Sequence, residues 1–166
     1  SEQLEMEVDN RMNRYLLFFA LAAVAALTFA AVALAQSGHF LGTPTCTDEG
    51  TTVECSGRVA GLGGTTFNIT VEAEGTAITE CRNPGGNVAP GQTFDLDVTG
   101  DAGPAPTPRN GSARFSLESD TPVAPAGSCP NPGWTASVTD VVFTSDATLT
   151  LLEDGNVSDV IVVPIS

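Results

Sequence analysis

The segment from residue 134 to residue 152, WTASVTDVVFTSDATLTLL, constrains the fold more than any other part of the chain. Its apolar side chains recur at every second residue, which is the period of a strand with one buried face. The period shifts by one residue at Thr139–Asp140, and such a shift indicates either a β-bulge or a strand that crosses between sheets. We expect a crossing there, with Trp134, the only tryptophan, in the hydrophobic core built against this segment.

The same alternation continues through the chain beyond residue 45. It predicts four further strands with these inward-facing residues: Val53, Cys55 and Val59; Phe67, Ile69, Val71 and Ala73; Phe94, Leu96 and Val98; Ala113, Phe115 and Leu117. No helical period follows residue 35, and turn signals separate the strands. The sequence therefore predicts an all-β fold, an antiparallel immunoglobulin-like or Greek-key β-sandwich of about 7–9 strands.

Glycine and turn residues predict where individual strands end. A break at Gly75 is expected to separate a shorter strand over residues 76–82 from the strand before it. The sequence EDGN at residues 153–156 predicts a two-residue hairpin. Its return strand is expected to place Val160 and Val162 opposite Leu149 and Leu151.

The N-terminal part has the order of a secretory signal. Arg11 and Arg14 precede an uncharged apolar run at residues 15–35 that ends in Ala-Leu-Ala. This order predicts cleavage after Ala35 and export across the cytoplasmic membrane, so that the protein is secreted or lies at the cell surface. An uncleaved membrane anchor is the alternative, because a run of this length can just span a bilayer.

These signals predict three parts of the chain. Residues 1–35 form an N-terminal apolar helix that is a signal peptide or an anchor, residues 36–45 form a flexible tether, and residues 46–166 form the β-sandwich domain. The tether contains His39, the only histidine.

Four cysteines, Cys46, Cys55, Cys81 and Cys129, all follow the predicted cleavage site. An even number in an exported domain predicts two disulfide bonds. We favour pairing Cys46 with Cys55, on the two arms of a short hairpin, and Cys81 with Cys129, which each open a similar loop; the two other connectivities stay open. A zinc site is not expected, since no C-x-x-C spacing is present.

The charge balance excludes whole classes of partner. The chain has 20 acidic residues against 6 basic residues, all arginine, for a net charge of −14. Nucleic acid is excluded as a partner, because binding its phosphates requires clustered Lys and Arg. Contact with a membrane is expected only if the apolar helix is retained. Self-association through an unpaired edge strand stays an open prediction.

Few residues are available for catalysis, and no catalytic residue is predicted. Beyond residue 35 there is no Lys, Tyr or Met, and His39 lies in the expected tether. Asp95 and Asp97 have the spacing of a glycosidase pair, but they lie on the solvated face of their strand. With Asp101 they also match the opening of a calcium loop, although Pro106 stands where that loop needs Glu. No cofactor or metal is expected; Asp95, Asp97 and Asp101 are the candidates if calcium binds.

Three segments carry a resemblance to a known family. CSGRVAGLGG at residues 55–64, CRNPGGNVAPGQ at residues 81–92 and CPNPGWTASVTDVVFTSDATLTL at residues 129–151 resemble, in matching order, a family of exported bacterial proteins of uncharacterised activity. The resemblance covers nearly all of the chain beyond residue 35. It implies export and a β-sandwich-like architecture, and it brings no catalytic residues with it.

Three functions from different classes follow from these observations. The first is a secreted or cell-envelope β-sandwich protein that is not an enzyme and has a structural or adhesive role. The second is an extracellular module that binds a glycan or calcium, with the ligand held by loops such as residues 83–92 and 131–133. The third, least favoured, is a carboxylate-based glycoside hydrolase.

Overall fold

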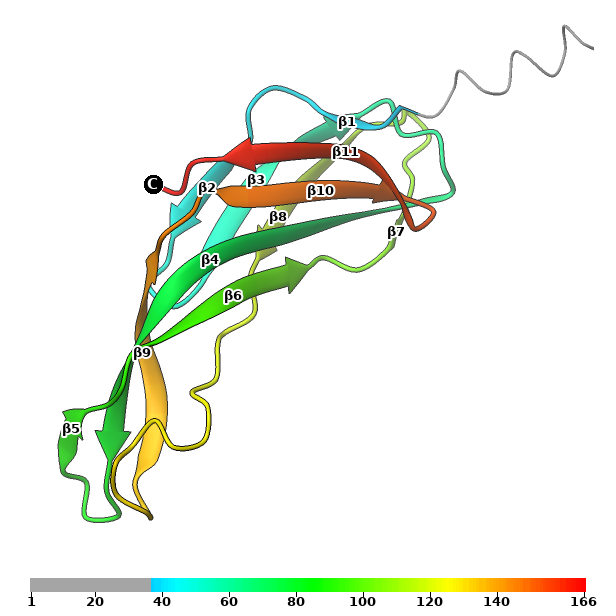
Figure 1. Ribbon diagram of the computed structural model, residues 1–166. Helices are drawn as coiled ribbons and strands as arrows, with labels where there is room; N and C mark the ends of the chain where they lie inside the picture. The colour runs from blue at the N-terminus through cyan, green and yellow to red at the C-terminus, as the bar shows by residue number, and fades with distance from the viewer. Residues whose placement is uncertain (1–36) are drawn as a thin grey trace, which may run out of the picture. The chain divides into compact units, whose positions relative to one another are not determined.

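The computed structural model describes residues 37–166; the predicted apolar helix and its cleavage site lie outside these described residues. From residue 37 onward the chain is all-β, and no helix there is long and apolar enough to cross a membrane. The strands are β1 (His39–Phe40), β2 (Thr45–Asp48), β3 (Val53–Ala60), β4 (Thr66–Arg82), β5 (Val88–Pro90), β6 (Phe94–Asp101), β7 (Ala105–Pro106), β8 (Ala113–Glu118), β9 (Thr135–Phe143), β10 (Ala147–Glu153) and β11 (Asn156–Val163). They form two antiparallel sheets (Figure 1). Residues 37–166 form eleven strands, more than the 7–9 that the sequence predicts. The excess comes from β1, β5 and β7, which have only two or three residues each and give no alternation that the sequence could display.

β4 is the central strand of the larger sheet, and it is paired along both of its edges. On one edge, β10 pairs with its first part and β9 with its second part. On the other edge, β7, β6 and β5 follow one another. β11 pairs with the outer edge of β10. The segment 134–152 therefore supplies two neighbours of the central strand, β9 and β10, rather than the central strand itself.

β4 runs without interruption through Gly75, so the predicted break there is wrong. A Cβ atom at this position would lie 2.6 Å from Val141 Cγ1 and 3.1 Å from the Val142 carbonyl oxygen. The glycine thus permits a close approach of β9 instead of ending the strand. The odd-numbered residues from Ile69 to Cys81 are all buried, which shows that the alternation continues across the glycine.

The shift of period at Thr139–Asp140 is a β-bulge and not a crossing between sheets. Asp140 pairs with Ile78 and Val138 pairs with Thr79, so Thr139 has no residue opposite it. Both β9 and β10 remain beside β4 in the larger sheet. The predicted crossing is therefore wrong. The sequence could not distinguish the two cases, because a bulge and a crossing reverse the inward face in the same way.

β3 is the central strand of the smaller sheet, with β1 and β2 along one edge and β8 along the other. The two sheets pack face to face around one hydrophobic core. Its fully buried side chains come from both sheets and include Val53, Val59, Ile69, Val71, Leu149 and Leu151. The inward positions predicted for the four alternating strands are confirmed, since each of these residues is buried or half-buried.

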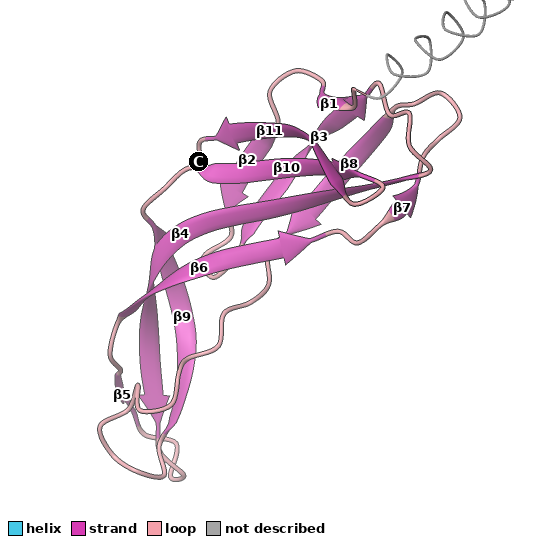
Figure 2. Ribbon diagram, turned by 45° about the vertical axis from the view of Figure 1, so that its right-hand side comes forward, coloured by secondary structure: helices cyan, strands magenta, loops and turns pink. Residues whose placement is uncertain are grey.

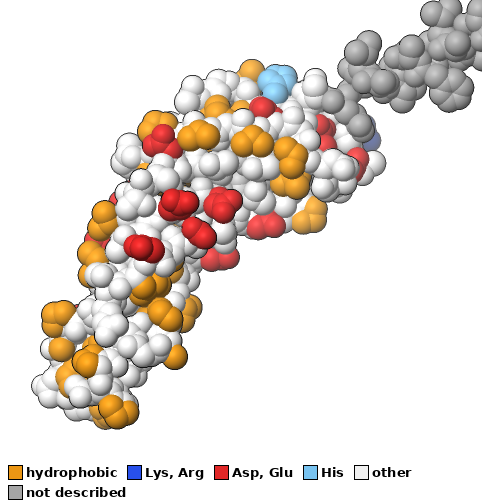
Figure 3. Space-filling model, viewed as in Figure 1, with side chains coloured by type: hydrophobic (Ala, Val, Ile, Leu, Met, Phe, Trp, Pro, Cys, Tyr) orange, Lys and Arg blue, Asp and Glu red, His pale blue; other side chains and the backbone are white. Residues whose placement is uncertain are grey.

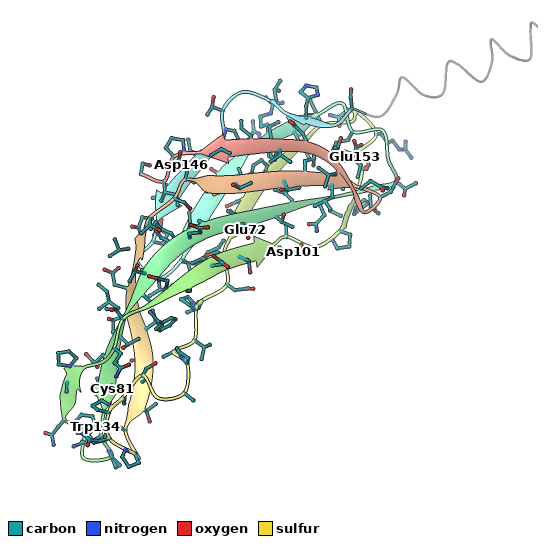
Figure 4. The ribbon with its side chains drawn as sticks, viewed as in Figure 1. Glu72, Cys81, Asp101, Trp134, Asp146 and Glu153 are labelled. Carbon is teal, nitrogen blue, oxygen red and sulfur yellow. A yellow bond between two sulfur atoms is a disulfide. The ribbon has the colours of Figure 1, made fainter. Side chains whose placement is uncertain are left out.

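Residues 76–82 of β4 continue beyond the smaller sheet, together with residues 83–94, which include β5, the loop 121–134 and β9 (Figure 2). We call this part the arm. A second, smaller cluster of Ala77, Val98 and Val141 lies at its base. Trp134 is half-buried and belongs to neither cluster, so its predicted place in the core is wrong. It precedes β9 directly and lies at the far end of the arm, where the second sheet no longer covers β4 (Figure 4).

The hairpin predicted at residues 153–156 is present, but the inward face of its return strand is not the predicted one. Asp154 and Gly155 occupy the turn with φ angles of 47° and 80°. A register shift between Leu151 and Leu152 then places Val160 opposite Thr150 and Val162 opposite Thr148. These two valines are 51% and 59% exposed, while the residues between and after them face the core. The bulge beside the turn shifts the pairing by one residue and so reverses the face.

The structure places part of the expected tether in the smaller sheet. β1 pairs with the end of β3, and Phe40 is buried with its ring in edge-to-face contact with Phe115, at a centroid distance of 5.9 Å. The Phe40 amide also donates a hydrogen bond of 2.9 Å to Asp159 of β11. A backbone bonded on both sides of this kind is ordered with the domain rather than separate from it.

Both favoured disulfide bonds are present in the structure. Cys46–Cys55 joins neighbouring residues of β2 and β3, and Cys81–Cys129 joins β4 to the loop before β9. Each bond therefore lies within or beside one sheet, and neither connects the two sheets. Two disulfide bonds are compatible with an extracellular or otherwise oxidising location.

Candidate functional site

The outer face of the larger sheet carries acidic side chains on two neighbouring strands. Glu72 and Glu74 lie on β4, and Asp95, Asp97 and Asp101 lie on β6; all five are exposed. In Figure 3 the acidic side chains gather over the region of β4, β6 and β10. Glu74 is directly opposite Asp97 in the register. Because like charges that face each other across strands destabilise a sheet, this acidic face is not explained by stability.

Two shallow grooves lie on the acidic face. One, of about 500 Å³, is lined by residues that include Glu74, Asp95 and Asp97. The other, of about 400 Å³, is lined by Glu72, Glu74 and Asp146, among others. The glycosidase pair Asp95 and Asp97 therefore borders a groove, but both carboxylates are exposed to water rather than enclosed in an apolar pocket.

The three aspartates proposed for calcium do not converge. Asp95 accepts a hydrogen bond of 2.8 Å from Thr76 Oγ1, and Asp101 accepts one of 2.7 Å from Asn68 Nδ2. They are six residues apart on one strand, or about 20 Å at the strand rise. Among residues 37–166, no three acidic, histidine or cysteine side chains gather closely enough to hold a metal ion.

Asp101 instead fixes the turn after β6. Its Oδ1 accepts a 2.7 Å hydrogen bond from the Gly103 amide. This amide, followed by the Asn68 side chain, lowers the pKa of Asp101 below its ordinary value of 3.8. The carboxylate thus acts as a local turn acceptor, which is a common role of aspartate at the end of a strand.

A second feature is the uncharged end of the arm, which we define as residues 83–94 and 121–139. These two stretches of 12 and 19 residues contain no acidic, basic or histidine side chain. They are joined in space by Cys81–Cys129 and by a 3.0 Å hydrogen bond from the Gln92 amide to the Ser128 carbonyl oxygen. Beside this end, in the last residues of β4, Arg82 and Glu80 form an ion pair at 3.3 Å, so their charges offset each other.

Two Asn-Pro-Gly turns close the uncharged end. The Gly86 amide donates to the Asn83 carbonyl oxygen at 2.9 Å, and the Trp134 amide donates to the Asn131 carbonyl oxygen at 3.3 Å. Proline presets the first turn position, and Gly86 and Gly133 have φ angles of 85° and 87° that other residues rarely adopt. Both loops are therefore rigid without contributing to a hydrophobic core.

The surface of this end is apolar as well as uncharged. Val88 is 48% exposed and Val123 is 86% exposed. Trp134 is half-buried, and the prolines of both turns are exposed. The lower end of the molecule in Figure 3 shows hydrophobic and uncharged atoms alone on that face. In a chain of net charge −14, so complete an absence of charge marks a surface that differs from the rest.

A third feature is the buried carboxylate of Glu153 at the start of the β10–β11 hairpin. It accepts hydrogen bonds from the amides of Gly38 at 2.9 Å, Gly63 at 2.8 Å and Gly64 at 3.2 Å. The Ser158 hydroxyl donates a fourth, at 2.7 Å. Burial raises the pKa of Glu153, but the four hydrogen bonds outweigh it and hold this pKa below its ordinary value of 4.5. Such a fully bonded carboxylate fastens loops together and is not free to react.

The neighbouring Asp154 fastens the start of β4. Both of its oxygens accept from the Thr65 amide at 3.1 Å, and one accepts from the Thr65 hydroxyl at 2.6 Å. The Thr66 amide donates to the same oxygen at 2.9 Å. These bonds, led by the Thr65 hydroxyl, lower the pKa of Asp154 from 3.8 to about 2. The GLGGTT sequence at residues 61–66 thus folds around the two acids of the hairpin turn.

Replacing Asp154 by asparagine is expected to make unfolding less sensitive to acid. A carboxylate with a lowered pKa stabilises the fold fully above its ordinary value, and this contribution is lost as the pH falls through the folded value. For Asp154 the window runs from pH 3.8 down to about 2. Urea unfolding at several pH values should show a shallower decline for Asp154→Asn than for the wild type. The control, Asp146→Asn, should keep the wild-type slope; equal slopes for all three proteins would contradict the assignment.

His39 is exposed on β1, with Nδ1 2.9 Å from the Ser37 carbonyl oxygen. It thus lies on the smaller sheet, and neither the acidic face nor the uncharged end includes it.

The structure brings together the two predicted loops, 83–92 and 131–133, through Cys81–Cys129 and the Gln92–Ser128 hydrogen bond. It does not bring the predicted calcium ligands together. The uncharged end was missed from the sequence, although its signal was readable as two long runs without charge. The chain matches no protein-family model, no curated protein and no solved structure with which it was compared.

Proposed function

We propose that this chain is an exported protein without catalytic activity that acts by adhesion, and that the uncharged end of the arm is its adhesive surface. Cleavage of the apolar run after Ala35, release to the cell surface or medium, and an immunoglobulin-like Greek-key arrangement of the two sheets belong to the same proposal. The strand alternation and the disulfide bonds support export and the sandwich.

The observation that carries adhesion is the separation of charge. Acidic side chains cover the outer face of the larger sheet, whereas residues 83–94 and 121–139 carry none. Charged residues are depleted at the centre of protein interfaces, and aromatic side chains are enriched there. Two proline turns and one disulfide bond hold the surface rigid, so little conformational entropy is lost when it binds.

The chemistry of this end fits an uncharged polysaccharide as the ligand, which is the second function predicted from the sequence. Trp134 offers the face or edge of an indole ring, and Asn87, Gln92 and Asn131 offer exposed amides. An aromatic ring with a few amides matches the apolar faces and hydroxyl groups of a neutral sugar. An anionic polymer would instead be repelled by the net charge of −14.

The test is retention of the protein on uncharged polysaccharides, for which cellulose and chitin serve as probes, against alginate as the anionic comparison. We expect binding to an uncharged matrix, and Trp134→Ala should weaken it by about 10- to 30-fold, as loss of a central aromatic contact does. Trp134→Phe should retain part of the affinity. Val162→Ala, which truncates an exposed apolar side chain on β11, is the matched control and should bind normally.

Equal binding of Trp134→Ala and the wild type, or preference for alginate, would overturn the proposed surface. Turnover of a polysaccharide that disappears in Asp95→Asn or Asp97→Asn would overturn the absence of catalysis. In that case the groove beside Glu74 would be the active site.

A further inference from the structure

Nearly every edge of the two sheets is covered or protected in the described part of the chain. On one side, the Asp120 amide donates a 2.7 Å hydrogen bond to the Thr99 carbonyl oxygen, which joins the end of β8 to β6. On the other side, β2 is bridged to Ile165, and its Asp48 amide donates to the Ser166 carbonyl oxygen at 3.1 Å. The two sheets are thereby linked at both sides.

The outer edges of β6 and β8 are otherwise unpaired, but these strands carry the charged residues Asp95, Asp97, Arg114 and Glu118. The edges of β11 and β5 also carry features that prevent pairing. Asp159 accepts hydrogen bonds of 2.9 Å from the amides of Phe40 and Val160. Its carboxylate therefore occupies the edge of β11. β5 has three residues and ends in Pro90, which has no amide hydrogen. Charges and prolines at edges are the usual protection against pairing with another chain.

The outer edge of β9 is different. Its upper part is covered, because the Val141 amide donates a 2.7 Å hydrogen bond to the Gly50 carbonyl oxygen. Below the bulge at Thr139, residues 135–138 pair with β4 on one side, and among the described residues no backbone hydrogen bond reaches their other side. Thr135 and Ser137 are exposed. This short stretch, TASV, contains neither charge nor proline.

We propose that the outer edge of β9, at residues 135–138, pairs with the same edge of a second copy of this chain. The two strands would run antiparallel about a two-fold axis and would join the larger sheets of both copies. A two-fold axis pairs a surface with itself, so the edge must be self-complementary. A stretch of Thr, Ala, Ser and Val meets this condition, since Thr and Ser pair favourably across strands in any register.

The edge itself carries no charge and so permits pairing with a second copy, while the charge elsewhere on the chain fixes the direction of pairing. Two chains of net charge −14 repel each other wherever their acidic faces meet. In the antiparallel arrangement the two β9 strands run in opposite directions, each toward the core of its own copy. The two acidic faces therefore lie at opposite ends of the dimer. The contact itself forms between segments that carry no charge. This inference goes beyond adhesion and does not depend on it.

The experiment is sedimentation velocity of the full chain in a mild detergent over a range of protein concentrations. We expect a reversible dimer, and Ser137→Asp should weaken it by about 10-fold or more, because it places two carboxylates near each other at the axis. Ser56→Asp makes the same change at an exposed position of β3, which is paired on both sides, and should leave the dimer intact.

A monomer at all concentrations would overturn the proposal, as would a dimer unaffected by Ser137→Asp, which would then form elsewhere in the chain. Hydrogen exchange gives a second measurement that needs no variant. Amides of residues 135–138 should gain protection as the protein concentration rises, and constant protection would contradict the pairing. Loss of polysaccharide binding in Trp134→Ala with an intact dimer would separate this inference from the proposed adhesion.

Discussion

Replacing Cys81 and Cys129 together by alanine is expected to lower the free energy of unfolding by about 4 kcal/mol, the loop-closure value for cysteines separated by 48 residues. The reason for a large effect is local as well as entropic. The arm has only a small cluster of Ala77, Val98 and Val141 at its base, so the disulfide bond replaces the core that the end of the arm lacks. Urea unfolding under non-reducing conditions measures the change.

The second disulfide bond provides the comparison. Cys46 and Cys55 are 9 residues apart and lie on paired strands beside the main core, so removing them should cost about 3 kcal/mol. Hydrogen exchange should separate the two variants further. Without Cys81–Cys129, amides of residues 76–82 and 135–138 should lose protection while those of β3 and β10 keep it. Equal effects on both regions would show that the arm does not depend on its disulfide bond.

Leu149→Ala is expected to cost about 2–5 kcal/mol, whereas Trp134→Ala should cost less than about 2 kcal/mol. Leu149 is fully buried between the two sheets, and its truncation leaves a cavity there. Trp134 is half-buried outside both clusters, although it is the larger side chain. Paired thermal and urea unfolding of the two variants measures the difference.

The opposite order of these two costs would place the indole in the core, as its size predicted from the sequence. Conservation of the fold in Trp134→Ala is also what allows the same variant to test adhesion. Leu151→Ala provides a check, because Leu151 is equally buried and should behave like Leu149.

The inward faces of individual strands were predictable, and the pairing between strands was not. Whether Val53 or Glu54 faces the core depends on local alternation, which the sequence displays. The place of β9 beside β4 depends on contacts about 60 residues apart in the chain, which no local pattern encodes. The shift at Thr139 has the same sequence pattern whether the strand bulges or crosses, so only the register distinguishes these cases.

The candidate site was predictable in the same partial way. The loops 83–92 and 131–133 were expected to act together, and the disulfide bond and the hydrogen bond at Ser128 bring them together. The calcium hypothesis considered three aspartates by sequence motif alone, but an extended strand holds them too far apart to share an ion. The prediction for Trp134 was wrong because hydrophobicity indicates that a side chain is favoured in a buried position. It does not indicate whether the fold covers that particular position.

β4 also has a mechanical consequence. This single strand of 17 residues runs through the larger sheet and into the arm. A pulling force applied at Trp134 therefore enters β4 through its pairing with β9 and is transmitted along the β4 backbone. Its neighbours on both edges then resist sliding, and many hydrogen bonds must rupture at once before the strand moves. An attachment made at the far end of the arm would therefore load the hydrogen bonds between strands in shear, all together, instead of opening them one at a time.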